Sequence, residues 1–140
     1  MAVLLPIVLL PVAAWTVEAS LVAARQAGLV EAAAQAAEDS AQTLDEARFR
    51  AGGGLDVLPG AATEVARAEV EADTGAQLVA ATVSGDTVTV RAEQWVPLSF
   101  GALIGWRGVL VHASVTARLA SGYESPSSLL PLPARIFSRA

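Results

Sequence analysis

The chain contains no cysteine and no lysine, a single histidine, and few aromatic residues. Without cysteine it has no disulfide, no thiolate metal site and no cysteine nucleophile. Charged residues make up 16% of the chain, whereas an average soluble domain has about 25%. All 9 basic residues are arginines, they are scattered, and the net charge is −5. A nucleic-acid partner, which requires clustered cations, is therefore not expected.

Residue patterns that carry enzyme chemistry are also missing. His112 has no cysteine and no second histidine with which to form a metal site. There is no G-x-S-x-G nucleophile elbow, and residues 51–54 (AGGG) lack the Gly-Lys-Ser/Thr of a phosphate-binding loop. Adjacent acidic residues on a helix point apart, so neither Glu38 and Asp39 nor Asp45 and Glu46 form a catalytic pair. We expect no enzyme, no catalytic residue, no cofactor, no metal and no small-molecule substrate.

What the chain has in abundance is apolar character at its start. Residues 2–17 (AVLLPIVLLPVAAWTV) carry no charge, and the apolar character resumes after Glu18 and lasts until Arg25. A membrane-spanning helix needs about 20 apolar residues and tolerates proline. We therefore expect a single-pass membrane anchor. A cleaved secretory signal, with residues 12–14 (VAA) before Trp15 as the cleavage site, and an internal buried helix are the alternatives.

The helical pattern continues beyond the apolar start. Residues 22–50 are rich in Ala, Glu, Gln and Arg, which are good helix formers, and contain one Gly and no Pro. Small apolar residues let helices approach closely. Here they recur at helical spacing and form a stripe: Leu21, Ala24, Gly28, Leu29, Ala32, Ala36 and Ala37. This stripe is predicted to pack either on the chain's own head or on neighbouring copies in an assembly.

The remaining residues predict a small head. Residues 51–60 are a Gly- and Pro-containing linker, and the head covers residues 61–120. It begins with a weakly amphipathic helix and continues with three predicted strands, of which the second and third alternate apolar and polar residues, as is typical of strands with one buried face. The predicted fold class is α+β. A long N-terminal membrane helix continues into an Ala-rich helix over residues 1–50, and one helix of the head packs on a three-stranded antiparallel sheet.

Two further segments stand out by composition. The connection between the second and third predicted strands, PLSFGALIGWRG, is apolar and includes Phe100, Leu103, Ile104 and Trp106. These side chains either pack under the sheet or are exposed for contact with a bilayer or a partner. Residues 121–140 are rich in Pro and Ser and are expected to be a disordered tail.

Several of these features together resemble a known family. The opening LLPIVLLPVAAWTVE and the later QAGLVEAAAQAA resemble the TadE/TadF-type pseudopilins of tight-adherence (Flp-type) pilus systems. Members have a Leu-Pro in the membrane segment, a later Glu, and an Ala-rich helix with an Arg, which here correspond to Leu5 and Pro6, Glu18, Arg25 and residues 32–37. DTVTVRAEQWVPL and VLVHASVTARLASG resemble the closing strands of short, actinobacterial-type members. The Gly and nearby Glu of the family's prepilin-peptidase site do not precede the apolar run in this chain.

The resemblance implies a minor pilin-like structural subunit of a Tad/Flp-type pilus or related secretion apparatus, with an extracytoplasmic head. Its expected partners are the membrane and other pilin-like subunits or the Tad secretion machinery. The expected partner of Glu18 is Arg25 or a neighbour's amino terminus. The alternative is a solitary membrane-anchored extracytoplasmic binding domain that uses its aromatic loop. The candidate interaction residues are Glu18, Arg25, Gly28, Ala32, Ala36 and Trp106.

Overall fold

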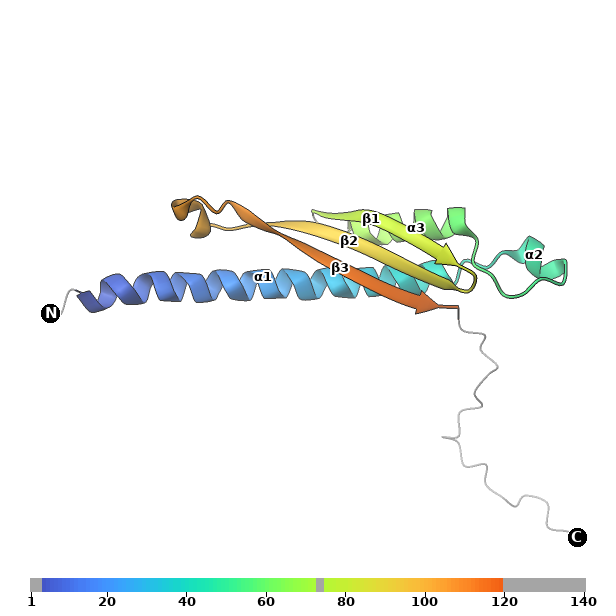
Figure 1. The fold of residues 1–140 in the computed structure, drawn as a ribbon, viewed down its shortest axis with the longest axis horizontal. Coiled ribbons are helices and arrows are strands. Elements are labelled where there is room, and N and C mark those ends of the chain that lie inside the picture. The colour runs from blue at the N-terminus through green and yellow to red at the C-terminus, as the bar shows by residue number, and fades with distance from the viewer. Residues whose placement is uncertain (1–3, 73–74, 120–140) are drawn as a thin grey trace, which may run out of the picture.

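The structure is a computed structural model that describes residues 4–72 and 75–119 (Figure 1). It begins with α1 (Leu4–Ala41), a helix of 38 residues that contains Pro11. The Ala-rich segment is helical, as its composition predicts. The helix ends at Ala41, however, so the prediction of one helix to residue 50 is wrong. The predicted tail at residues 121–140 lies outside the described residues.

Local and tertiary contacts meet where α1 ends, although good helix formers continue beyond that point. The Thr43 hydroxyl donates to the Ser40 carbonyl at 2.6 Å, and the Thr43 N–H bonds to the same carbonyl at 3.2 Å. The buried Ser40 hydroxyl donates to the Ala62 carbonyl at 3.0 Å. Just beyond, Leu44 forms an isolated β-bridge with Val57. The chain is thus tied to a later segment at the point where α1 ends.

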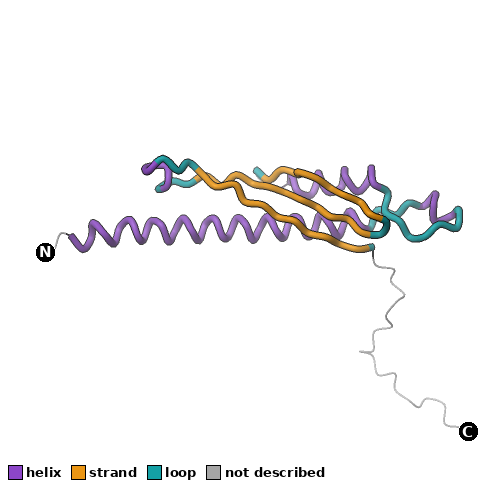
Figure 2. Tube along the Cα trace, viewed as in Figure 1, coloured by secondary structure: helices purple, strands orange, loops and turns teal. Residues whose placement is uncertain are grey.

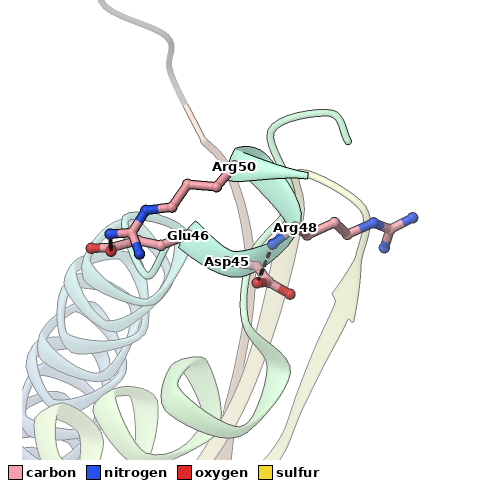
Figure 3. A network of polar contacts seen from close by, with 4 residues as sticks. All are labelled: Asp45, Glu46, Arg48 and Arg50. Atoms are coloured by element: carbon pink, nitrogen blue, oxygen red, sulfur yellow. Dashed lines mark hydrogen bonds and ion pairs between the residues drawn. The ribbon is translucent and has the colours of Figure 1, made fainter. Parts of the chain in front are cut away.

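A short helix, α2 (Glu46–Arg50), follows at the end of the molecule opposite to the N-terminus (Figure 1). The Asp45 carboxylate caps it by accepting the Arg48 N–H at 3.0 Å, and Arg50 pairs with Glu46 at 2.6 Å (Figure 3). These side chains are largely exposed, and exposed ion pairs contribute only about 0–1 kcal/mol. We therefore assign this polar cluster a local structural role.

The head consists of one helix and three strands. Helix α3 (Pro59–Ala72) begins at a proline, which suits the first turn because the missing N–H needs no partner there. The strands β1 (Ala76–Ser84), β2 (Thr87–Pro97) and β3 (Gly108–Arg118) form an antiparallel sheet in the order β1-β2-β3. The predicted α+β class and the three-stranded antiparallel sheet are confirmed.

Two helices cover one face of this sheet: the head helix that was predicted there, and the C-terminal half of α1, for which packing on the head was one of two expectations. The C-terminal half of α1 packs on β2 and β3, and α3 packs on β1 and β2 and against α1 (Figure 2). Alternation along β2 buries Val88, Val90 and Ala92, as expected. The two helices contribute Leu29 and mostly alanines to this core: Ala33, Ala36, Ala37, Ala41, Ala62 and Ala66. Because alanine side chains are small, the helices lie close to the sheet and to each other.

The N-terminal half of α1 extends past the sheet toward the N-terminus (Figure 1). The connection between β2 and β3, which contains the 3₁₀-helix η1 (Gly101–Ile104), ends the head on that side (Figure 2). The molecule therefore has a projecting apolar rod on one side of this connection and a compact two-layer head on the other.

Candidate functional site

The projecting half of α1 is apolar and uncovered. Its side chains are mostly exposed, for example Leu5 at 68% and Leu10 at 71%. Helix α1 is long and apolar enough to cross a membrane, judged by length and composition. The alternative of an internal buried helix is wrong for this half, because little of the apolar segment is covered by the rest of the chain.

Glu18 is the exception in this exposed segment, since its side chain is only 6% exposed. Its Oε2 atom accepts the Gly101 N–H at 2.9 Å, and its Oε1 atom accepts the Phe100 N–H. A buried carboxylate needs hydrogen-bond donors, and charge-assisted bonds of this kind are among the stronger ones. Glu18 therefore joins α1 to the connection between β2 and β3.

The partner expected for Glu18 within the chain was Arg25, and this expectation is wrong. Arg25 lies about two helical turns further along α1 and is exposed. The carboxylate instead accepts the backbone N–H groups of Phe100 and Gly101, which lie 82 and 83 positions further along the chain.

The connection between the strands, residues 98–107, is closed by its own backbone and is called the tip loop below. Hydrogen bonds from the Leu98 N–H to the Arg107 carbonyl at 3.1 Å and from the Trp106 N–H to the Gly101 carbonyl at 2.8 Å bring its ends together. Gly105, with φ of 92°, ends η1 in the left-handed region that glycine adopts most readily. At Gly101 a Cβ would lie 2.8 Å from the Trp106 carbonyl oxygen, so this tight approach requires a glycine.

A pair of tryptophans forms a second contact between α1 and the tip loop. The rings of Trp15 and Trp106 lie 6.2 Å apart with their planes inclined by 52°. Tilted aromatic pairs at this separation contribute about 0.5–1.5 kcal/mol beyond the area that they bury. Both rings remain more than half exposed, at 55% and 58%. The tip loop is thus held to α1 by one polar and one aromatic contact.

The large apolar side chains of the tip loop are exposed, including those that border α1. Phe100, Leu103, Ile104 and Trp106, together called the apolar tip below, are all exposed, and Leu103 reaches 82%. The alternative in which these residues pack under the sheet is therefore wrong. Between the tip loop and residues 10–18 of α1 runs an open groove of about 810 Å³, lined almost entirely by apolar side chains.

The structure separates the six residues proposed from the sequence. Glu18 and Trp106 lie at the junction between α1 and the tip loop. Arg25 and Gly28 are exposed on α1, Ala32 is half-buried, and Ala36 is fully buried in the chain's own core. Ala36 therefore cannot contact a neighbouring copy while the head is folded. The predicted stripe divides into a part that packs on the head and a part that does not.

Sequence reasoning missed the residues that bind Glu18. Phe100 and Gly101 bind through backbone N–H groups, and a pattern of side chains does not predict such contacts. Two signals were present: an acidic residue in an apolar helix requires a partner, and glycines at 101 and 105 within an apolar connection indicate a tight turn.

The only histidine of the chain lies on the surface of the head. His112 faces Glu93 at 3.8 Å across neighbouring strands, and its side chain is 65% exposed. Across residues 4–72 and 75–119, no cluster of three or more His, Asp or Glu side chains is arranged to hold a metal ion. The junction formed by Glu18, Trp15 and the tip loop is therefore our candidate functional site.

The fold and this site define a class of protein, namely a two-layer α+β head carried on a long apolar helix. The exposed half of that helix begins where the tip loop contacts α1. Comparisons of the chain with protein-family models, with curated proteins and with solved structures give no match.

Proposed function

We propose that this chain is a membrane-anchored, pilin-like structural subunit, similar to the TadE-like pseudopilins of Tad/Flp-type pili or a related secretion apparatus. One observation carries the proposal. A single continuous helix has its C-terminal half in the core of the head and its N-terminal half outside it, with apolar side chains directed outward. A soluble monomer gains nothing from such a rod, because each exposed apolar Å² forgoes about 25 cal/mol of burial.

A membrane and neighbouring helices are the partners that this rod fits. Apolar residues at its start suit lipid, and helices of this composition associate through close contact between small residues. Leu21, Ala24 and Gly28 recur at helical spacing and are all exposed, so they form a stripe beside the covered face of α1. We call it the exposed stripe and propose that it packs against other subunits, with the head outside the cytoplasm.

Membrane fractionation tests the anchoring. We expect the full chain to remain in the membrane pellet after alkaline carbonate extraction and its N-terminal sequence to include the apolar segment. A variant that lacks residues 1–17 is expected to move to the soluble fraction, because it loses the uncharged run. Recovery of the unaltered chain as a soluble protein that starts near Trp15 would instead establish a cleaved signal and refute the anchor.

Disulfide cross-linking tests the assembly. The chain has no cysteine, so a single introduced cysteine reports one position without background. We expect Gly28→Cys to give disulfide-linked dimers in membranes, because helices that meet at small residues approach closely, and a disulfide needs Cα atoms about 4.4–6.8 Å apart. The matched control is Arg67→Cys on the outer surface of α3, which is also exposed and should remain monomeric. Equal dimer yields from both variants would indicate random collision and count against the proposal.

The second candidate function is a solitary membrane-anchored binding domain. The exposed apolar tip and the groove of about 810 Å³ beside it favour this alternative, because concave apolar sites are where small ligands bind. The cross-linking experiment separates the two functions. A solitary domain would be anchored in the membrane and yet give no dimers through Gly28.

A further inference from the structure

We propose that the apolar tip inserts into the same membrane that α1 crosses, so that the head rests on the bilayer instead of standing clear of it. Acyl chains of that bilayer then fill the groove between the tip loop and α1. This inference rests on the membrane anchoring in the proposed function and adds a second point of attachment, made by the head itself.

The first argument is depth along α1. A hydrocarbon core about 30 Å thick takes about 20 helical residues, and any window of that length that contains the uncharged residues 4–17 also contains or adjoins residues 10–18. The tip loop contacts Trp15 and Glu18 and borders the groove along residues 10–18. It therefore lies beside the part of α1 that must be within or at the edge of the apolar layer if the helix crosses.

The second argument is charge. The last residue of the tip loop, Arg107, is charged and exposed where the loop joins β3. Residues 98–106 (LSFGALIGW) contain no charged residue, and neither do residues 4–17 of the adjoining helix. The one charge between them, Glu18, is covered by the tip loop and hydrogen-bonded. At this end of the head, large apolar side chains are thus exposed, whereas the Glu18 carboxylate of α1 is buried. Polar surroundings would favour the reverse arrangement.

The third argument concerns the backbone of the tip loop. Irregular backbone that faces lipid does not occur within the hydrocarbon region, so the tip loop must lie at the edge of that region and pair its polar groups within the protein. Most N–H groups of residues 98–106 have an acceptor in the chain, namely those of Leu98, Phe100, Gly101, Leu103, Gly105 and Trp106. Two of these donors depend on the Glu18 carboxylate. Glu18 therefore allows a non-helical loop to lie in an apolar environment, while the loop shields the carboxylate from lipid.

A second copy of the chain is the competing occupant of this surface. A protein partner would match an apolar tip equally well, but it would not explain why the tip lies at the depth of the uncharged part of α1. The bilayer explains both observations, because the tip and the helix then occupy the same apolar layer.

The test uses the full chain in lipid nanodiscs, with one cysteine at a time labelled with the environment-sensitive fluorophore NBD. Leu103→Cys reports the apolar tip, and Val8→Cys reports the anchor. Phe49→Cys is the matched control, because it is an exposed apolar residue on α2 at the far end of the molecule (Figure 1). All three side chains are exposed, so the substitutions preserve the fold. Nanodiscs are prepared with and without lipids that carry a doxyl quencher on the acyl chain.

We expect the labels at residues 8 and 103 to emit at shorter wavelength and to lose most of their emission to the quencher lipid. The label at residue 49 should keep its emission. Quenching at residue 8 without quenching at residue 103 would overturn the inference and leave the anchor intact. A blue-shifted but unquenched label at residue 103 would also overturn it, in favour of a second copy. Absence of quenching at residue 8 would refute the anchoring itself.

Discussion

Replacement of Ala36 by leucine is expected to destabilise or unfold the head, whereas the same replacement at Gly28 is expected to leave it folded. Ala36 lies on the face of α1 that packs on the head, and its side chain is fully buried. A larger side chain in a packed core costs about 1–3 kcal/mol or more, and a small domain has only about 5–15 kcal/mol in total. At Gly28 an added Cβ meets nothing within 4 Å, and leaving glycine raises helix propensity by up to about 1 kcal/mol.

Thermal unfolding in detergent micelles, followed by near-ultraviolet circular dichroism, measures this difference. Ala36→Leu should lower the midpoint clearly, and Gly28→Leu should leave it unchanged or raise it slightly. Equal destabilisation by both variants would contradict the division of the stripe into a covered and an exposed part.

The same pair separates folding from assembly. With Ala24→Cys as the cross-linking reporter on the exposed stripe, the added Gly28→Leu should reduce dimer formation, because a bulky residue holds neighbouring helices apart. Unchanged cross-linking in this folded variant would show that the exposed stripe is not the contact between subunits. The cross-linking yield of Ala36→Leu carries no such meaning, since its head is destabilised.

Loss of the Glu18 carboxylate is expected to release the tip loop from α1. In Glu18→Ala the N–H groups of Phe100 and Gly101 lose their acceptor, and an unsatisfied buried donor costs about 1–3 kcal/mol. A change of 1.4 kcal/mol is a factor of about ten in an equilibrium constant, so the exchange of these two amides with deuterium should accelerate by about 5- to 150-fold. Glu18→Gln keeps one carbonyl acceptor and should give a smaller acceleration.

Hydrogen exchange of the full chain in nanodiscs, resolved to the peptide that contains residues 98–107, measures this release. Glu31→Ala is the matched control, because Glu31 is also a glutamate of α1 but is exposed. It should leave exchange in the tip loop unchanged. If Glu18→Ala likewise leaves the exchange unchanged, the carboxylate does not hold the loop, and the Trp15–Trp106 contact must be the one that does.

Local patterns predicted most of the secondary structure. Strict alternation placed the buried face of β2 at Val88, Val90 and Ala92, and the predicted segments correspond to the three observed strands. The end of α1 could not be predicted in this way. Residues 42–50 contain good helix formers, but Ser40 bonds to Ala62 and Leu44 pairs with Val57. Contacts with a later part of the chain thus overrode local helix propensity.

By itself the sequence determined which chemistry is missing, where the apolar rod and the strands lie, and that Glu18 needs a partner. These features depend on residue type and on spacing between near neighbours, so they can be read from one chain. Only the tertiary structure decided which small residues of α1 are covered and that the tip loop is exposed. It also decided that the distant backbone N–H groups of Phe100 and Gly101 bind the Glu18 carboxylate. Each of these depends on how segments distant in the chain come together, and periodicity along one helix carries no information about that.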